Sequence, residues 1–115
     1  MSWSRHAFVA LIASVVCGQI SALAAGPVCP ARHSQPLRFV DVFDGPPEEL
    51  ATLVPDAAKN RSGYWELGYV YDANRIVTIR CRYADGNTVD IKLTEKIERC
   101  SYKIDAKKTL RLRCK

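Results

Sequence analysis

The sequence has little histidine, no clustered glycine and, after position 24, no long apolar run. His33 is the one histidine beyond that position, and it lies in a proline-punctuated arm, where a surface histidine is far commoner than a catalytic one. The glycines are isolated from one another, so they form no phosphate-binding loop. A membrane-spanning helix needs about 20 apolar residues, which no segment after position 24 supplies. We therefore expect neither a nucleotide-binding loop nor a transmembrane segment in the mature chain.

The sequence also lacks a recognisable catalytic or metal-binding motif. Glu48 and Glu49 are adjacent, and their place at the start of an expected helix explains them without acid-base chemistry. The cysteines after position 24 lie far apart, whereas zinc ligands are usually closely paired. A catalytic triad can still assemble from residues that are distant in sequence, but nothing here marks one. We expect no enzymatic activity, no cofactor and no metal site.

The first 24 residues have the pattern of a secretory signal peptide. Arg5 supplies a short positive region, residues 7–16 are apolar, and Ala22-Leu23-Ala24 fits the small-x-small cleavage rule. Cys17 follows two valines where a lipoprotein signal would have a small residue, so we interpret it as part of the signal peptide. The prediction is an exported protein with a signal peptide over 1–24 and a single small domain over 25–115.

The mature domain holds four cysteines, Cys29, Cys81, Cys100 and Cys114. An even number in a small exported domain indicates two disulfides, which supplement a thin core. Four cysteines allow three pairings. The strand pattern described next favours Cys100 with Cys114, which leaves Cys29 with Cys81.

Five segments alternate apolar and polar residues with the period of a β-strand. They span 64–71, 75–84, 89–94, 100–104 and 110–114. In the last hairpin, Ile104 opposite Leu110 brings Cys100 directly opposite Cys114. The same reasoning places Tyr69 near Val77 and Trp65 near Cys81 in the first hairpin, and Ile91 beside Cys81 in the second.

Two further elements precede these strands. Residues 37–43 have the β-branched and aromatic content of a strand. Residues 46–54 begin with prolines and glutamates and end before Pro55, which indicates a short helix whose apolar side, Leu50, Leu53 and Val54, packs on the sheet. Residues 57–63 are expected to form a polar loop. The predicted fold is α+β: an antiparallel meander of five to six strands with one short helix packed on it, stapled by disulfides.

Several short motifs together resemble a known family. They are Cys29-Pro30, Phe43-Asp44-Gly45-Pro46-Pro47, Leu53-Val54-Pro55-Asp56, Tyr64-Trp65-Glu66-Leu67, Arg80-Cys81-Arg82-Tyr83 and Arg99-Cys100-Ser101-Tyr102. In these the chain is similar to a family of small secreted proteobacterial proteins of unknown function that is named after a typhoid Salmonella locus tag. The resemblance covers most of the mature chain and implies a bacterial periplasmic protein. It carries over no catalytic residues.

Charge is distributed unevenly along the chain. Residues 26–74 hold four basic and seven acidic residues, a net charge of −3, and residues 75–115 hold twelve basic and five acidic residues, a net charge of +7. Strand alternation points much of this positive charge to one sheet face. The residues concerned are Arg80, Arg82, Lys92, Arg99, Lys103, Arg111 and Arg113. Such a face either docks something acidic or merely solvates and protects the sheet.

The nature of the partner is constrained only in part. An exported protein rarely meets nucleic acid, and no aromatic residue alternates with the outward cations as base stacking requires. Two hypotheses remain. The first is a binding or inhibitor-like module that docks an acidic protein. The second is a structural or envelope-assembly accessory with weak affinity for anionic polymers or lipids.

Overall fold

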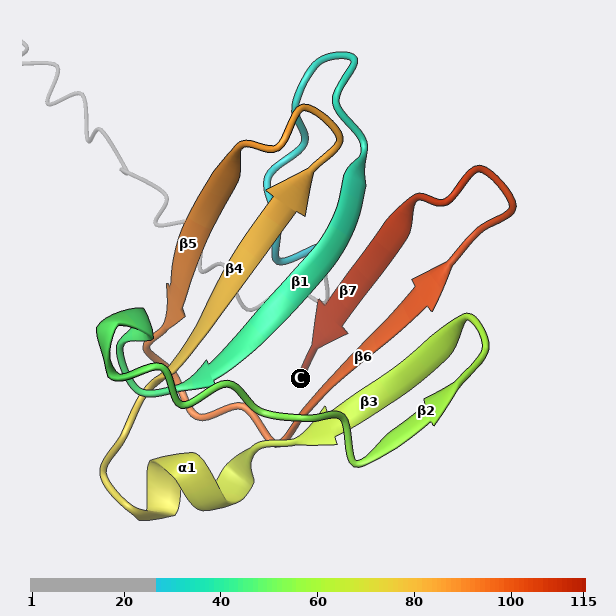
Figure 1. The fold of residues 1–115 in the computed structure, drawn as a ribbon. Helices are drawn as coiled ribbons and strands as arrows, with labels where there is room; N and C mark the ends of the chain where they lie inside the picture. Colours follow the sequence, from blue (N-terminus) through green and yellow to red (C-terminus); the bar gives the residue numbers. More distant parts are fainter. Residues whose placement is uncertain (1–26) are drawn as a thin grey trace, which may run out of the picture.

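The computed structural model describes residues 27–115, so the expected signal peptide over 1–24 lies outside the described residues. The described chain forms seven antiparallel strands in two sheets, one short α-helix and one 3-10 turn. Figure 1 shows their arrangement. The α+β class is thereby confirmed. Within residues 27–115, no helix is long and apolar enough to span a membrane.

The three-stranded sheet has the order β1-β4-β5. Its strands are β1 (Leu37–Asp44), β4 (Val77–Tyr83) and β5 (Thr88–Leu93). The central strand, β4, is buried along most of its length, because Val77, Ile79 and Cys81 are completely inaccessible. Across from β4, β1 contributes Val40 opposite Cys81 and Val42 opposite Ile79. The strand predicted over 37–43 is confirmed.

The four-stranded sheet has the order β2-β3-β6-β7. Its strands are β2 (Ala57–Lys59), β3 (Ser62–Glu66), β6 (Arg99–Ile104) and β7 (Leu110–Cys114). In β6 and β7 apolar and polar residues alternate strictly, so one face is buried and the other meets solvent. The predicted register of this hairpin is confirmed, since Ile104 lies opposite Leu110 and Cys100 opposite Cys114.

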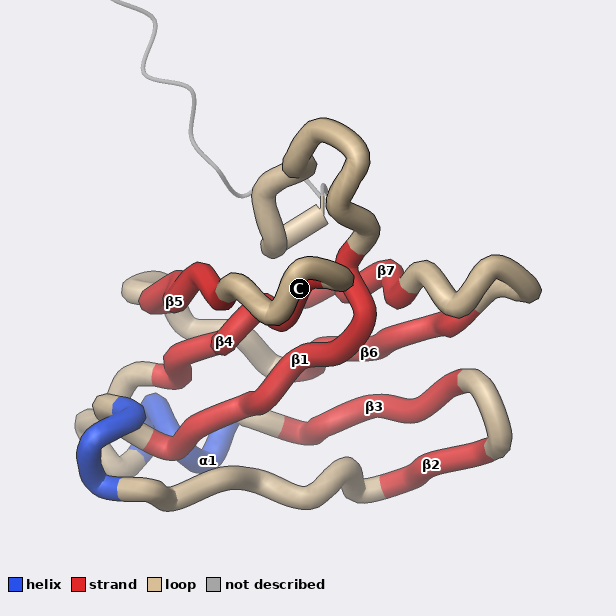
Figure 2. The backbone as a smooth tube through the Cα atoms, turned by 45° about the horizontal axis from the view of Figure 1, so that its top comes forward, coloured by secondary structure: helices blue, strands red, loops and turns tan. Residues whose placement is uncertain are grey.

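The two sheets enclose a single core. Strand β1 contacts β7, and Figure 2 shows the strands of both sheets side by side around this point. Trp65 and Leu112 from the four-stranded sheet and Val42 and Ile79 from the other are all at most 3% exposed. Trp65 also packs on Tyr102, with 5.3 Å between ring centroids. Burial of these side chains from two sheets supplies the main favourable free energy of folding.

Two disulfides connect the strands. Cys29 is joined to Cys81, which ties the N-terminal arm to the buried strand β4, and Cys100 is joined to Cys114 across the β6–β7 hairpin. Both pairs are those that the strand pattern favoured. Cys81 and Cys100 are completely inaccessible, so the sulfur atoms form part of the core.

The segment 64–71, predicted as one strand, is two different elements. Its first part belongs to β3, and the rest is helix α1 (Gly68–Asp72). Alternation predicted that Tyr69 faces inward, but Tyr69 is 55% exposed and Val70 is completely buried. Leu67, Val70 and Tyr71 follow the i, i+3, i+4 spacing of a helix, so a single buried helical side replaces the expected strand face.

The pairing of the strands also differs from a single meander. Because 64–71 does not form a hairpin with β4, Trp65 lies opposite Cys100 instead of Cys81, and Tyr69 does not pair with Val77. The β4–β5 hairpin exists, but its register places Ile91 opposite Ile79 and not beside Cys81. Strand β5 does not pair with β6, since each belongs to a different sheet.

The expected helix over 46–54 is reduced to the 3-10 turn η1 (Pro47–Glu49). Leu50 adopts a left-handed conformation and ends the turn at once. The following residues run extended beside β1, where Thr52 bridges Phe43. The predicted apolar side therefore does not form: Leu53 packs against the core, whereas Leu50 and Val54 face solvent. The prediction of a loop over 57–63 is also wrong, because these residues contain β2 and the start of β3.

Candidate functional site

The seven outward cations predicted from strand alternation lie on two different sheets. The fold separates them because β4 and β5 belong to one sheet and β6 and β7 to the other. Arg80, Arg82 and Lys92 lie on the three-stranded sheet. Arg99, Lys103, Arg111 and Arg113 lie on the four-stranded sheet. The seven cations are therefore distributed over two sheets, and each group is considered by itself.

The two arginines of β4 are neutralised by neighbouring carboxylates. Arg80 donates two hydrogen bonds to Asp90, at 2.9 and 3.1 Å, and its guanidinium lies over the ring of Phe43. The hydrogen bond from Arg80 holds the pKa of the Asp90 carboxyl below its ordinary value. Arg82 donates to Asp41 at 2.6 Å. Since both charges are matched within the domain, these side chains offer little attraction to an outside partner.

Arg99 on β6 is occupied in the same way. It forms an ion pair with Glu66 on the adjacent strand β3 and stacks over Tyr64, 4.2 Å from the ring centroid. The hydrogen bond to Glu66 raises the pKa of the Arg99 guanidinium. The charge of Arg99 is therefore compensated by Glu66 and does not add to the unpaired positive charge of this sheet face.

The remaining cations of this sheet form a row across its strands. We call Lys59, Lys103, Arg111 and Arg113 the basic strip. Register aligns Lys59 with Ser62, Ser62 with Lys103 and Lys103 with Arg111, so three of the four lie in one cross-strand line. All four are exposed, and within residues 27–115 none of them forms an ion pair. Like charges directly opposite each other on a sheet are destabilising, so this arrangement costs folding free energy.

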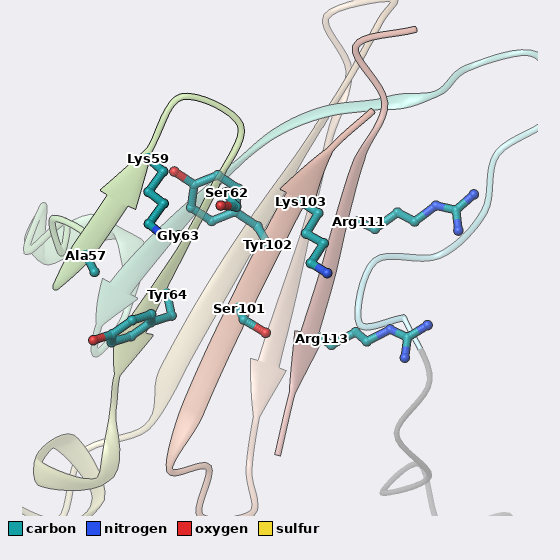
Figure 3. Close-up of a pocket in the computed structure, with 10 residues that line it drawn as sticks. All are labelled: Ala57, Lys59, Ser62, Gly63, Tyr64, Ser101, Tyr102, Lys103, Arg111 and Arg113. Atoms are coloured by element: carbon teal, nitrogen blue, oxygen red, sulfur yellow. The ribbon is translucent and has the colours of Figure 1, made fainter. Parts of the chain in front are cut away.

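The basic strip borders a groove of about 620 Å³. Its lining comes from all four strands of the sheet: Ala57, Lys59, Ser62, Gly63, Tyr64, Ser101, Tyr102, Lys103, Arg111 and Arg113. Figure 3 shows Arg111 and Arg113 extending in the same direction from β7, with Lys59 and Tyr64 on the opposite side over β2 and β3. The site thus combines free cations at its margins with hydroxyls and aromatic rings between them.

Gly63 shapes this surface. A Cβ at that position would lie 2.5 Å from the carbonyl oxygen of Ala57 and 2.7 Å from the ring of Tyr102. Glycine therefore allows the Tyr102 ring to lie against β3 while it also packs on Trp65. Through these contacts the groove lies directly on the buried core.

The predicted set of outward cations lacks one member of the strip, Lys59. The polar character of residues 57–63 predicts a loop there, so strand alternation does not apply to this lysine. In the structure Lys59 pairs with Ser62 across a tight turn at Asn60 and Arg61, and this short hairpin brings the lysine onto the sheet. The asparagine between two short segments was the available signal, since asparagine tolerates turn conformations.

Comparison with known proteins identifies a family. A family model described as "Type VI secretion system Tli immunity protein" matches residues 31–115, which is more than half of the chain. No curated protein and no solved structure matches the chain. The match agrees with the implied small proteobacterial family but gives no support to the locus-tag name. The chain belongs to the Tli immunity protein family of the type VI secretion system.

Proposed function

We propose that this protein protects a bacterial cell by binding a toxic effector of the type VI secretion system in the periplasm. The family match over residues 31–115 carries the proposal. Immunity by binding requires no catalytic group, so the protein acts as a stoichiometric inhibitor and not as an enzyme. Two disulfides suit an oxidising compartment such as the periplasm, to which the expected signal peptide would direct the chain.

The basic strip is the surface that we assign to the effector. Its four cations lack partners within residues 27–115, although pairing them would lower the free energy of the domain. An acidic region of an effector would supply the missing carboxylates. Charge complementarity of this kind accelerates encounter and disfavours wrong partners. Tyr64 and Tyr102 in the groove add aromatic surface, which protein interfaces favour.

A second candidate is an envelope accessory that holds anionic polymers or lipids. The unpaired charge of the strip would attract any polyanion, so this alternative uses the same observation. It differs in specificity, because attraction of exposed charge alone is screened by salt and does not select a partner. The family match favours the first candidate.

Protection and binding can be tested together. Each type VI effector of the source strain is directed to the periplasm of a sensitive host, with and without this chain. We expect the chain to restore growth against one effector and to form an equimolar complex with it that survives 0.5 M salt during gel filtration. If no effector is neutralised and the chain is instead retained on envelope material until salt is added, the protein is an envelope accessory and the immunity proposal is wrong.

A further inference from the structure

Two large apolar side chains of the segment 45–56 are turned into solvent. Leu50 is 79% exposed and Val54 is 83% exposed, whereas Leu53 between them packs against the core. Exposing a leucine and a valine forgoes about 1.5 to 3 kcal/mol for each side chain relative to burial. We call the segment 45–56 the spur. In Figure 1 it runs from the end of β1 past α1 to β2.

The spur is held firmly although its surface is apolar. The backbone N–H of Leu53 donates to Val42 at 2.8 Å, and the indole N–H of Trp65 donates to the Leu53 carbonyl at 3.1 Å. At the end of the spur, the backbone N–H of Asp56 donates to Tyr64 at 2.9 Å. These bonds attach the spur to both sheets and fix which of its side chains point outward.

Arg75 fixes the other end. Its Nε donates to a carboxylate oxygen of Asp44 at 2.7 Å, and its guanidinium also binds Glu49 within the 3-10 turn. Gly45 makes this clamp possible, because its φ of +87° suits glycine and a Cβ there would overlap the Arg75 guanidinium. The contacts of Arg75 with Asp44 and Glu49 thus hold together the two sides of the turn that contains Leu50.

Leu50 is also in a strained backbone conformation. Its φ of 57° lies in the left-handed region, which costs a leucine roughly 1 to 2 kcal/mol. Strain of this kind persists only where surrounding contacts impose it, and it concentrates at functional sites. Pro46, Pro47 and Pro55 further restrict the spur. A segment that is already ordered loses little entropy on binding, so its exposed apolar groups are suited to be interface anchors.

The charge of the spur defines the partner's chemistry. Residues 44–56 contain four acidic residues and no basic residue. Arg75 pairs with Asp44 and Glu49, so of these four carboxylates Glu48 and Asp56 form no ion pair within residues 27–115. Tyr69 and Ile76, at 55% and 42% exposed, extend the apolar surface on neighbouring segments. Burial first, and then the charges of Asp44 and Asp56, raise the pKa of the Tyr69 phenol. The complementary surface is an apolar recess with a basic margin.

We propose that the spur is a second contact with the effector, in which Leu50 and Val54 enter an apolar recess bordered by basic residues. This inference rests on the proposed function, because the effector is its committed occupant. The basic strip and the spur then have different roles in binding the effector. The strip accelerates encounter, and the spur slows dissociation by burying apolar area.

The test removes the anchors and keeps the fold. Leu50→Asn with Val54→Ser deletes both apolar side chains, and asparagine tolerates the left-handed conformation at position 50. Phe39→Ser is the matched control, because Phe39 is a 50% exposed apolar residue of β1 outside the spur. Binding to the purified effector that the wild-type chain neutralises is measured by surface plasmon resonance. Thermal unfolding of each variant verifies the fold.

We expect the double variant to bind the effector at least about tenfold more weakly, because it dissociates faster. The dependence of its association rate on salt should be unchanged. Phe39→Ser should bind as the wild type does. An unchanged dissociation rate for the double variant overturns the inference while protection stands. A concentration-dependent dimer of the wild-type chain that the double variant abolishes also overturns it, because the spur then meets a second copy. If the wild-type chain neutralises no effector, the proposed function fails and the inference fails with it.

Discussion

The arginines of this domain differ in whether a carboxylate of the same domain neutralises their charge. Arg82 and Arg111 both occupy outward positions in the sequence pattern, and sequence alone assigns them the same role. In the structure Arg82 donates to Asp41, whose side chain is 17% exposed, whereas Arg111 faces Lys103 across β6 and β7. Reversing the first charge leaves a partly buried carboxylate beside a like charge. Reversing the second removes a repulsion.

This difference predicts distinct effects on stability. We expect Arg82→Glu to lower the free energy of unfolding by about 1 kcal/mol or more, because an ion pair is replaced by repulsion. For a domain of this size, that corresponds to a fall in Tm of roughly 4 to 8 °C. Arg111→Glu should leave Tm within about 2 °C of the wild type or raise it slightly. Thermal unfolding at low salt measures both.

Arg82→Gln serves as the control for lost pairing without repulsion, and its Tm should fall between those of the wild type and Arg82→Glu. Equal losses of Tm for Arg82→Glu and Arg111→Glu would contradict the conclusion that Arg82 is paired within the domain and Arg111 is not.

The sequence predicts the pairing of strands that are close together along the chain. It does not predict the pairing of strands that are far apart along the chain. The β6–β7 register follows from a short turn and strict alternation, because Ile104 and Leu110 are close in sequence. In the β4–β5 hairpin the turn lies one residue earlier than expected. Gly86, at φ 83°, donates to Tyr83 there, and the register shifts by two residues while the inward side is kept.

Pairing between β3 and β6 and between β1 and β4 joins segments far apart along the chain. No turn signal marks such pairs, so the separation into two sheets was not accessible from one sequence. The same limit explains the segment 64–71. Tyrosine and valine favour strands, yet β3 ends at Glu66 and the helix α1 begins at Gly68.

The two disulfides belong to elements of different loop length, and their removal should differ accordingly. The chain-entropy argument assigns about 4 kcal/mol to the Cys29–Cys81 link, which closes a sequence separation of 52, and about 3 kcal/mol to Cys100–Cys114, with a separation of 14. Cys29→Ala with Cys81→Ala also removes the covalent link between the core and the arm before β1. We expect the larger fall in unfolding free energy from this pair, measured by urea denaturation.

Peptide mapping under non-reducing conditions provides the independent check of connectivity. A peptide joining Cys81 to Cys100 would contradict both the sheet order and the pairing, since these strands lie in different sheets.

At the scale of the molecule, the cations of residues 75–115 differ in whether the fold pairs them with carboxylates. The net charge of +7 over residues 75–115 suggested one basic face. Folding pairs Arg75, Arg80, Arg82 and Arg99 with internal carboxylates. Within residues 27–115, Lys103, Arg111 and Arg113 of the four-stranded sheet and Lys92 of the three-stranded sheet form no ion pair. Only the fold decided which cations remain available to a partner.

Matched reversals on the two sheets test whether this location matters for encounter. Arg111→Glu and Lys92→Glu change the net charge of the protein by the same amount, and both residues are exposed. Arg111 lies in the basic strip, whereas Lys92 lies on the three-stranded sheet opposite Thr78. If the strip guides the effector, position should decide the outcome, because at physiological salt exposed charges act over only about 8 Å.

We expect Arg111→Glu to slow association with the neutralised effector several-fold at low salt and to reduce the dependence of that rate on salt. Lys92→Glu should change the association rate by less than about twofold, and neither variant should alter the dissociation rate much. Stopped-flow association measured from 20 to 300 mM salt separates these cases. Equal slowing by the two variants would mean that total charge attracts the effector without regard to position, and the basic strip would then be no more than a solvated surface of the sheet.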